Sequence, residues 1–229
     1  MSYQFEEGEI LLVDKPLRWT SFDVVNSIRT FLKIEFRLKK IKIGHAGTLD
    51  PLATGLLILC TGRMTKRIEE FKEFDKEYTG TFTIGATTPS FDLETEMDQT
   101  FPYDHISEEI IGNAVQRLIG SYDQLPPVFS AKKINGKRAY EYARKDQEVI
   151  MVTKRVSVPE FEITSVQLPV IGFRIVCSKG TYIRAIARDF GLLLNCGAHL
   201  SSLCRTRIGP YLLKNAHSPE ELKKVLLPQ

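Results

Sequence analysis

The stretch from Ile43 to Arg63, IGHAGTLDPLATGLLILCTGR, constrains the fold more than any other part of the chain. Residues 56–60, LLILC, form a continuous apolar run of the length expected for a buried strand. Glycines lie on both sides of Asp50, and glycine lets a backbone take positive φ or approach a ligand closely. Pro51 biases Asp50 away from the helical region. The stretch therefore predicts a core strand that holds a shaped loop carrying one acid.

The same stretch carries a histidine, His45, and it supports two interpretations. In one, the loop presents Asp50 and His45 to a ligand. In the other, the loop is a turn that closes a strand pair, Asp50 only caps it, and His45 satisfies loop backbone groups. Spacing and composition leave both interpretations open.

Composition places the chain among soluble globular proteins, because 43% of its 229 residues are hydrophobic and 26% are charged. This length suits one large domain or two small ones. The apolar runs are too short to span a bilayer, and the N-terminus lacks the basic region of a signal peptide. The four cysteines and four histidines are scattered. We therefore expect reduced thiols in a cytoplasmic protein, no metal site and no membrane association.

Charge is distributed unevenly along the chain. Residues 15–45 contain eight Lys or Arg against two acids, and residues 130–155 contain eight against three. Residues 92–109 contain seven acids and no Lys or Arg. Two basic blocks with an acidic block between them favour a polyanionic partner, against the alternative of ordinary surface charge.

Helical and strand patterns are interspersed without regular βαβ alternation, which predicts an α+β fold with a mixed, mostly antiparallel sheet flanked by helices. The acidic stretch 86–105 has no periodicity and predicts an exposed loop. Asn135-Gly136 predicts a hairpin that leads into a basic helix. The predicted helices are 19–34, 61–74, 107–119, 181–195 and 218–226, and the main predicted strands are 9–13, 56–60, 76–85, 172–178 and 200–208.

Asp50 is the first catalytic candidate, since a carboxylate can act as nucleophile, general base or charge stabiliser. Arg184 could hold a carboxylate or a phosphate, unless it is a surface arginine lying over an apolar face. Tyr78 could stack on a base, unless it is an ordinary aromatic on a sheet face. The P-loop, dinucleotide and G-x-S-x-G motifs are absent, so no cofactor is expected.

The segment GHAGTLDPLATGLLILCTGRMTK closely resembles the catalytic motif of the bacterial tRNA pseudouridine-55 synthases, the TruB family. The likeness extends to other family motifs, in family order, from residue 8 to about residue 211. These segments are GEILLVDKPLRWTSFDVV, FKEFDKEYTGTFTIG, LPPVFSAKKINGKRAYEYAR and CSKGTYIRAIARDFGLLLNCGAHLSSLCRTRIGPY. They cover most of the chain.

The resemblance implies the pseudouridine synthase fold and an isomerase that converts uridine-55 in the T loop of tRNA to pseudouridine. It implies base flipping, an aspartate nucleophile and no cofactor. The T stem-loop of tRNA is the expected partner of a monomer without an obligate protein partner. Residues 1–211 would form the catalytic domain, and residues 212–229 a short tail helix in place of the PUA domain of longer relatives.

The resemblance also assigns residue roles. Asp50 matches the nucleophile, Tyr78 the tyrosine that stacks on the target uracil, and Arg184 the arginine that pairs with the aspartate. The other predicted site residues are His45, Tyr182, Leu200, Asp92 and Lys132 for substrate and RNA, with Lys15 and Pro16 as support for the catalytic loop. The sequence departs from the family pattern near Asp92, where Pro89 and Phe91 replace more polar residues.

Three other hypotheses fit part of these observations. An RNA-binding or RNA-folding protein could retain the site without using it. A synthase of the archaeal-eukaryotic guide-RNA type would share the motifs. An aspartate-nucleophile hydrolase would release the base, and a base-release assay distinguishes it from an isomerase.

Overall fold

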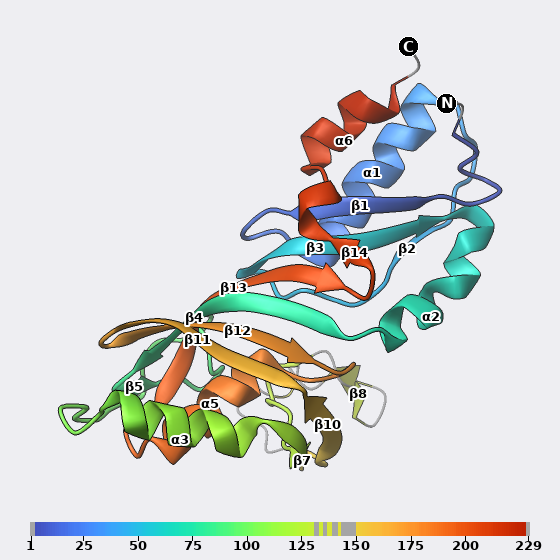
Figure 1. The fold of residues 1–229 in the computed structure, drawn as a ribbon. Helices are drawn as coiled ribbons and strands as arrows, with labels where there is room; N and C mark the ends of the chain where they lie inside the picture. Colours follow the sequence, from blue (N-terminus) through green and yellow to red (C-terminus); the bar gives the residue numbers. More distant parts are fainter. Residues whose placement is uncertain (1–2, 131–132, 135–136, 139–141, 143–149, 228–229) are drawn as a thin grey trace. The chain divides into compact units, whose positions relative to one another are not determined.

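The structure is a computed structural model that describes residues 3–130, 133–134, 137–138, 142 and 150–227 (Figure 1). The chain divides into two compact units. The first unit comprises residues 1–79 and 203–229, and the second comprises residues 80–202. The chain passes between the units within two strands, β4 (Lys76–Ile84) and β13 (Ala198–Ile208), so each unit contains part of both.

The sheet of the first unit is mixed, as predicted. Besides its parts of β4 and β13 it contains β1 (Ile10–Lys15), β2 (Ile43–His45), β3 (Ala53–Thr61) and β14 (Tyr211–Leu212). The strand order is β1-β3-β13-β4, with β2 beside β3 and β14 beside β13. Strands β1 and β2 run antiparallel to β3, whereas β13 runs parallel to it. Leu203 of β13 lies opposite Ala53.

The central strand of this unit, β3, is buried on both faces. Leu57 and Leu59 belong to a core cluster shared with α1 (Ser21–Glu35) and α6 (Pro219–Leu226). Leu56 and Ile58 belong to a second cluster that includes Phe71 of α2 (Ile68–Glu73). A strand covered on both sides needs apolar residues at every position. The buried strand predicted from the LLILC run is therefore confirmed.

Side-chain caps define three of the predicted helix starts, including that of α3 (Glu108–Leu118), where the Ser107 hydroxyl accepts from the Ile110 amide. Thr20 caps α1, its side chain accepting from the Asp23 amide while the Asp23 carboxylate accepts from the Thr20 amide. Ser218 and Glu221 form the same reciprocal box at α6, which begins with Pro219. The predicted helix 61–74 is interrupted instead. Residues 62–67 form a 3₁₀ helix before α2, and the Thr65 hydroxyl donates to the Gly62 carbonyl within it (2.7 Å).

Removing the α6 cap should lower stability without affecting activity. A Ser218→Ala variant loses the bonds to Glu221, and we expect a decrease of about 1 kcal/mol in the free energy of unfolding. Urea denaturation measures this, with Ser218→Thr as the control that keeps a capping oxygen. Equal stability of the alanine variant and the wild type would contradict the assignment.

The second unit pairs its parts of β13 and β4 with β12 (Val170–Cys177) and β11 (Glu160–Gln167), in the order β13-β4-β12-β11. Its helices are α3 (Glu108–Leu118) and α5 (Ile183–Leu193). The remaining strands form antiparallel pairs: β7 (Gly120–Gln124) with β10 (Lys154–Val158), β5 (Ala86–Thr87) with β6 (Gln99–Thr100), and β8 (Lys133–Ile134) with β9 (Lys137–Arg138).

Aromatic packing fixes α5 to the sheet of the second unit. Phe82 of β4 stacks on Phe173 of β12 with ring centroids 4.2 Å apart. Phe190 of α5 lies 5.5 Å from Phe82 and 6.0 Å from Phe161 of β11. All four rings are buried. Such aromatic contacts hold the helix against the strands and so determine where its first turn lies.

The structure corrects a second sequence prediction and leaves others open. The acidic stretch 86–105 is not simply an exposed loop, because it forms β5 and β6 and buries Thr88, Ser90 and Asp92. The predicted hairpin is confirmed by β8 and β9, but the basic helix after it falls outside the described residues. The tail helix is α6, and the domain boundary at residue 211 stays a prediction. No helix in the described part of the chain could cross a membrane.

Candidate active site

Asp50 lies half-buried on the loop between β2 and β3, in the conformation that the glycines and Pro51 predict. Its carbonyl accepts from the Ala53 amide (3.0 Å), which closes a tight turn around the exposed Pro51. Gly47 and Gly55, on either side of Asp50, have φ of +98° and +100°. Glycine adopts this backbone region without steric cost, so Gly47 lets the loop turn and Gly55 permits a positive φ near the start of β3.

Helix α1 holds the residue before Asp50. The Ser21 hydroxyl accepts from the Leu49 amide (2.9 Å) and donates to the Leu49 carbonyl (3.2 Å). Leu49 and Ser21 are both buried. A buried amide and carbonyl that are both satisfied by one side chain have little freedom to move. The first turn of α1 therefore fixes the backbone that leads into Asp50.

Lys15 holds the residue after Asp50. Its side chain is fully buried, and Nζ donates to the carbonyls of Trp19 (2.6 Å), Pro16 (3.0 Å) and Pro51 (3.5 Å). The Pro51 carbonyl also accepts from the Arg18 amide (2.8 Å). This geometry is compatible with the support predicted for Lys15 and Pro16, a role that stays a prediction.

Burial also lowers the pKa of the Lys15 ammonium, to about 8. The nearby Asp50 carboxylate opposes this decrease, and the Arg205 guanidinium adds to it. The carboxylates of Asp50, Asp14 and Asp23 offset part of the desolvation, because opposite charges favour the protonated ammonium.

Lys15 should make the free energy of unfolding depend on pH in the alkaline range. Its pKa is lower in the folded protein than the ordinary value of 10.5, so the unfolded chain binds more protons between about pH 8 and pH 10.5. Stability relative to a Lys15→Met variant should therefore rise with pH in this window, by about 2 kcal/mol at about pH 9.5. Urea denaturation of both proteins measures the difference. A difference that stays constant over this range would contradict the assignment.

His45 lies at the end of β2 and is half-buried. Burial lowers the pKa of its imidazole, and the Arg205 charge lowers it further, so the ring is neutral at neutral pH. Its buried Nδ1 has no hydrogen-bond partner among the described residues. The ring lines a pocket of about 430 Å³ that Thr48, Thr65 and Lys72 also line. A neutral ring here could hydrogen-bond or stack on a ligand.

Arg205 of β13 also contacts the Asp50 loop, and sequence inspection missed it. Its side chain is 1% exposed, Nε donates to the Leu56 carbonyl (2.7 Å) and Nη2 donates to the Gly47 carbonyl (3.1 Å). The available sequence signal was an arginine within a predicted strand, but nothing local indicates which residues it contacts. Tyr78, on β4 in the same unit, is 9% exposed, and its predicted stacking on uracil stays a prediction.

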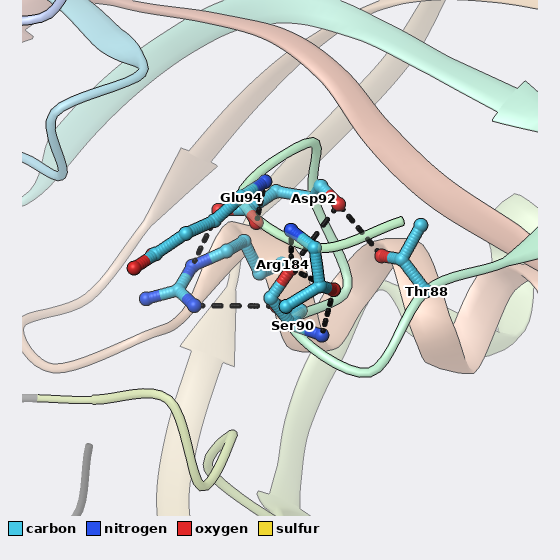
Figure 2. A network of polar contacts seen from close by, with 6 residues as sticks. Thr88, Ser90, Asp92, Glu94 and Arg184 are labelled. Atoms are coloured by element: carbon cyan, nitrogen blue, oxygen red, sulfur yellow. Dashed lines mark hydrogen bonds and ion pairs between the residues drawn. The ribbon is translucent and has the colours of Figure 1, made fainter. Parts of the chain in front are cut away.

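In the second unit, Arg184 lies in the first turn of α5 within a polar network that Figure 2 shows. The guanidinium Nε lies 3.5 Å from the Asp92 carboxylate, and Nη1 donates to the Ser90 carbonyl (3.2 Å). Asp92 Oδ1 accepts from the Glu94 amide (2.9 Å), and its carbonyl accepts from the Thr88 hydroxyl (2.7 Å). Arg184 and Asp92 are each 4% exposed, so this is a buried ion pair.

This network excludes the interpretation of Arg184 as a surface arginine and gives Asp92 a buried position. Phe91, one of the departures from the family pattern, lies in the same turn. Phe91 has φ of +62°, its carbonyl accepts from the Leu200 amide (2.9 Å), and its ring lies 5.2 Å from the Arg188 guanidinium carbon. The 88–92 turn is thereby packed into the second unit.

Of the remaining predicted residues, Leu200 and Tyr182 belong to the second unit and Lys132 lies outside the described residues. Leu200 is buried. Tyr182 occupies the N-cap position of α5, where its amide donates to Gln124 Oε1 (2.8 Å) and its carbonyl accepts from Gln124 Nε2 (3.2 Å). Asp50 belongs to the first unit and Arg184 to the second, so their pairing stays a prediction. The part of the chain that the structure describes contains no cluster of His, Cys, Asp or Glu suited to a metal.

Two family models match the chain. Residues 33–183 match the N-terminal domain of the TruB family pseudouridylate synthases, and residues 184–228 match the C-terminal domain of tRNA pseudouridylate synthase B. The chain belongs to the TruB family. As a TruB-family member it is an enzyme that isomerises uridine in tRNA to pseudouridine.

Curated TruB relatives match over nearly the whole chain. The tRNA pseudouridine synthase B of Phocaeicola vulgatus is 56% identical over 97% of this chain and 94% of that protein. The protein of the same name from Flavobacterium johnsoniae is 56% identical over 93% of each chain.

Solved structures show the pseudouridine synthase fold. A Cbf5-Nop10-Gar1 complex contains a chain with a TM-score of 0.67 and 27% identity, which covers 91% of this TruB-family chain and 50% of that chain. A chain of an H/ACA RNP bound to a substrate RNA has a TM-score of 0.69 at 24% identity. The match covers 96% of this chain and 53% of that chain. This chain thus spans about half the length of these solved chains.

Proposed function

We propose that the enzyme converts uridine-55 in the T loop of tRNA to pseudouridine, with Asp50 as the nucleophile. The observation that supports this most directly is the construction of the Asp50 loop. Ser21 binds the residue before Asp50, and Lys15 binds the residue after it. A carboxylate on a backbone fixed at both neighbours is preorganised for attack. The TruB motif around Asp50 and the names of the curated relatives support the same substrate.

The reaction breaks the C1′–N1 glycosidic bond, rotates the uracil, forms a C1′–C5 bond and releases the C5 proton. A uridine inside a folded RNA loop must first be flipped out of its stack. Asp50 could attack C1′ of the sugar or C6 of the ring, or assist a glycal route in which Tyr78 acts as base. All three routes require an ionised carboxylate held close to the nucleoside.

The other roles follow from the resemblance. Tyr78 stacks on the uracil, Arg184 pairs with the Asp50 carboxylate, and Asp92 is a polar residue of the RNA-binding loop. His45 displaces the target nucleotide. Tyr182, Leu200 and Lys132 contact the substrate RNA.

The T stem-loop of tRNA is the proposed partner, bound by a cytoplasmic monomer without an obligate protein partner. The first unit exposes the basic residues Lys33, Arg37, Lys39, Lys40 and Lys42. Cations of this kind bind phosphates and position an RNA without reading its sequence. The guide-RNA hypothesis has weaker support, because the chain is 56% identical to a curated tRNA pseudouridine synthase B but 27% identical to the matching chain of a Cbf5-Nop10-Gar1 complex.

The position of the modification can be tested with unmodified tRNA transcripts. Wild-type protein should form one pseudouridine, at position 55, in a transcript of natural sequence. A transcript with cytidine at position 55 should remain unmodified while binding with similar affinity. Modification at another uridine would contradict the assignment to position 55, and release of free uracil would indicate a hydrolase.

A further inference from the structure

One buried guanidinium joins the two ends of the loop that carries Asp50. Arg205 Nη2 donates to the carbonyl of Gly47, where the loop begins. Its Nε donates to the carbonyl of Leu56, in the strand β3 that follows the loop. These bonds measure 3.1 and 2.7 Å. All these residues lie in the first unit. The separation between the beginning and the end of the loop is therefore set by a single rigid group.

Close backbone packing brings Arg205 to this place. In the parallel pairing of β13 with β3, Arg205 lies opposite Gly55. A Cβ at Gly55 would lie 2.4 Å from the Arg205 carbonyl oxygen, so only glycine allows this approach. A Cβ at Gly47 would lie 3.5 Å from Nη1 of Arg205. The Arg205 backbone thus packs against Gly55, and its guanidinium packs against Gly47.

Arg205 makes no ion pair within the described part of the chain, although it is the largest fully buried side chain there. Burying an unpaired charge is costly, and an apolar side chain of similar volume would usually be more stable. Packing alone therefore does not account for an arginine here. A planar guanidinium offers several donors in a fixed geometry and can bind two carbonyls at once, which a lysine ammonium on a flexible stem does less well.

We propose that Arg205 is a positioning residue for the reaction, holding Asp50 in its reactive position by binding the Gly47 and Leu56 carbonyls together. The proposal rests on the proposed role of Asp50 as nucleophile. Arg205 acts through the loop backbone and touches no reacting atom. Ser21 and Lys15 fix the residues next to Asp50, and Arg205 fixes the ends of the same loop. The Arg205 charge lowers the pKa of both Lys15 and His45, which agrees with a position of Arg205 close to the Asp50 loop.

The test compares Arg205→Lys and Arg205→Gln with the wild type. The matched control is Arg207→Gln, which removes a guanidinium from the same strand, one that pairs with Glu77 (3.7 Å). We expect the single-turnover rate of tritium release from C5-labelled uridine in tRNA to fall about 100-fold in both Arg205 variants. The Kd for tRNA should stay unchanged. Arg207→Gln should match the wild type in both measurements.

Hydrogen exchange gives a readout that does not depend on activity. Peptides covering residues 47–56 should exchange faster in the Arg205 variants, while peptides from α6 should exchange at the wild-type rate. If Arg205→Gln fails to fold, Arg205→Lys decides the outcome. This variant keeps the positive charge but cannot make the two hydrogen bonds to the Gly47 and Leu56 carbonyls at once. A folded Arg205→Lys protein with wild-type rate and wild-type exchange in 47–56 would overturn the proposal, as would a loss confined to tRNA affinity.

An Asp50→Asn variant measured in parallel separates the two proposals. If Asp50→Asn is inactive and the Arg205 variants are as active as the wild type, only the positioning role fails. If Asp50→Asn retains activity, the proposed function of Asp50 fails. Ser21→Ala adds a further test, since two residues that hold one loop should show non-additive effects on the rate when both are replaced.

Discussion

An Asp50→Asn variant should form no detectable pseudouridine while binding tRNA as tightly as the wild type. Asparagine has nearly the same shape as aspartate but is not a nucleophile, so the rate should fall at least about 10⁴-fold. The loop should keep its structure, because Ser21 and Lys15 bind backbone groups of Leu49 and Pro51 that the substitution leaves in place. Tritium release and filter binding measure the two quantities separately.

Asp75→Asn is the matched control for this experiment. Asp75 is an exposed aspartate of the same unit, and its backbone carbonyl accepts from the Gly209 amide independently of its side chain. This variant should have the wild-type rate. Turnover by Asp50→Asn within about tenfold of the wild type would remove Asp50 from the chemical step.

An Asp92→Asn variant should lose both stability and activity. The substitution removes the carboxylate that lies 3.5 Å from the buried Arg184 guanidinium, and breaking a buried ion pair by removing one partner costs about 3 kcal/mol or more. Urea denaturation measures the loss. The rate of pseudouridine formation should also fall, because the guanidinium loses the group that orients it. Glu96→Gln, an exposed acid of the same stretch, should change the free energy of unfolding by less than about 0.5 kcal/mol.

A double replacement separates the two effects. Asp92→Leu combined with Arg184→Met exchanges the buried pair for apolar side chains, a change that is often neutral or stabilising. We expect the double variant to recover most of the stability lost by Asp92→Asn and to remain inactive. Recovery of activity with stability would mean that the pair serves folding alone.

The sequence by itself was sufficient wherever the physical cause was local. The apolar run 56–60 predicted a buried strand, since a strand covered on both faces has no place for polar residues. Thr20 and Ser218 predicted helix starts, because a cap acts on amides within three residues of it. The glycines around Asp50 predicted a shaped loop, since positive φ is a property of the residue itself.

Only the tertiary structure decided which charged groups are buried and what they contact. Residues 86–105 read as an exposed loop because no local pattern shows that Asp92 meets Arg184, a residue far along the chain. Arg205 was overlooked for the same reason, as its acceptors on Gly47 and Leu56 belong to the opposite end of the sequence. A charged side chain is stable in a core only when distant segments bring it partners. Sequence therefore placed Asp50 on its loop, and tertiary packing determined what holds that loop in place.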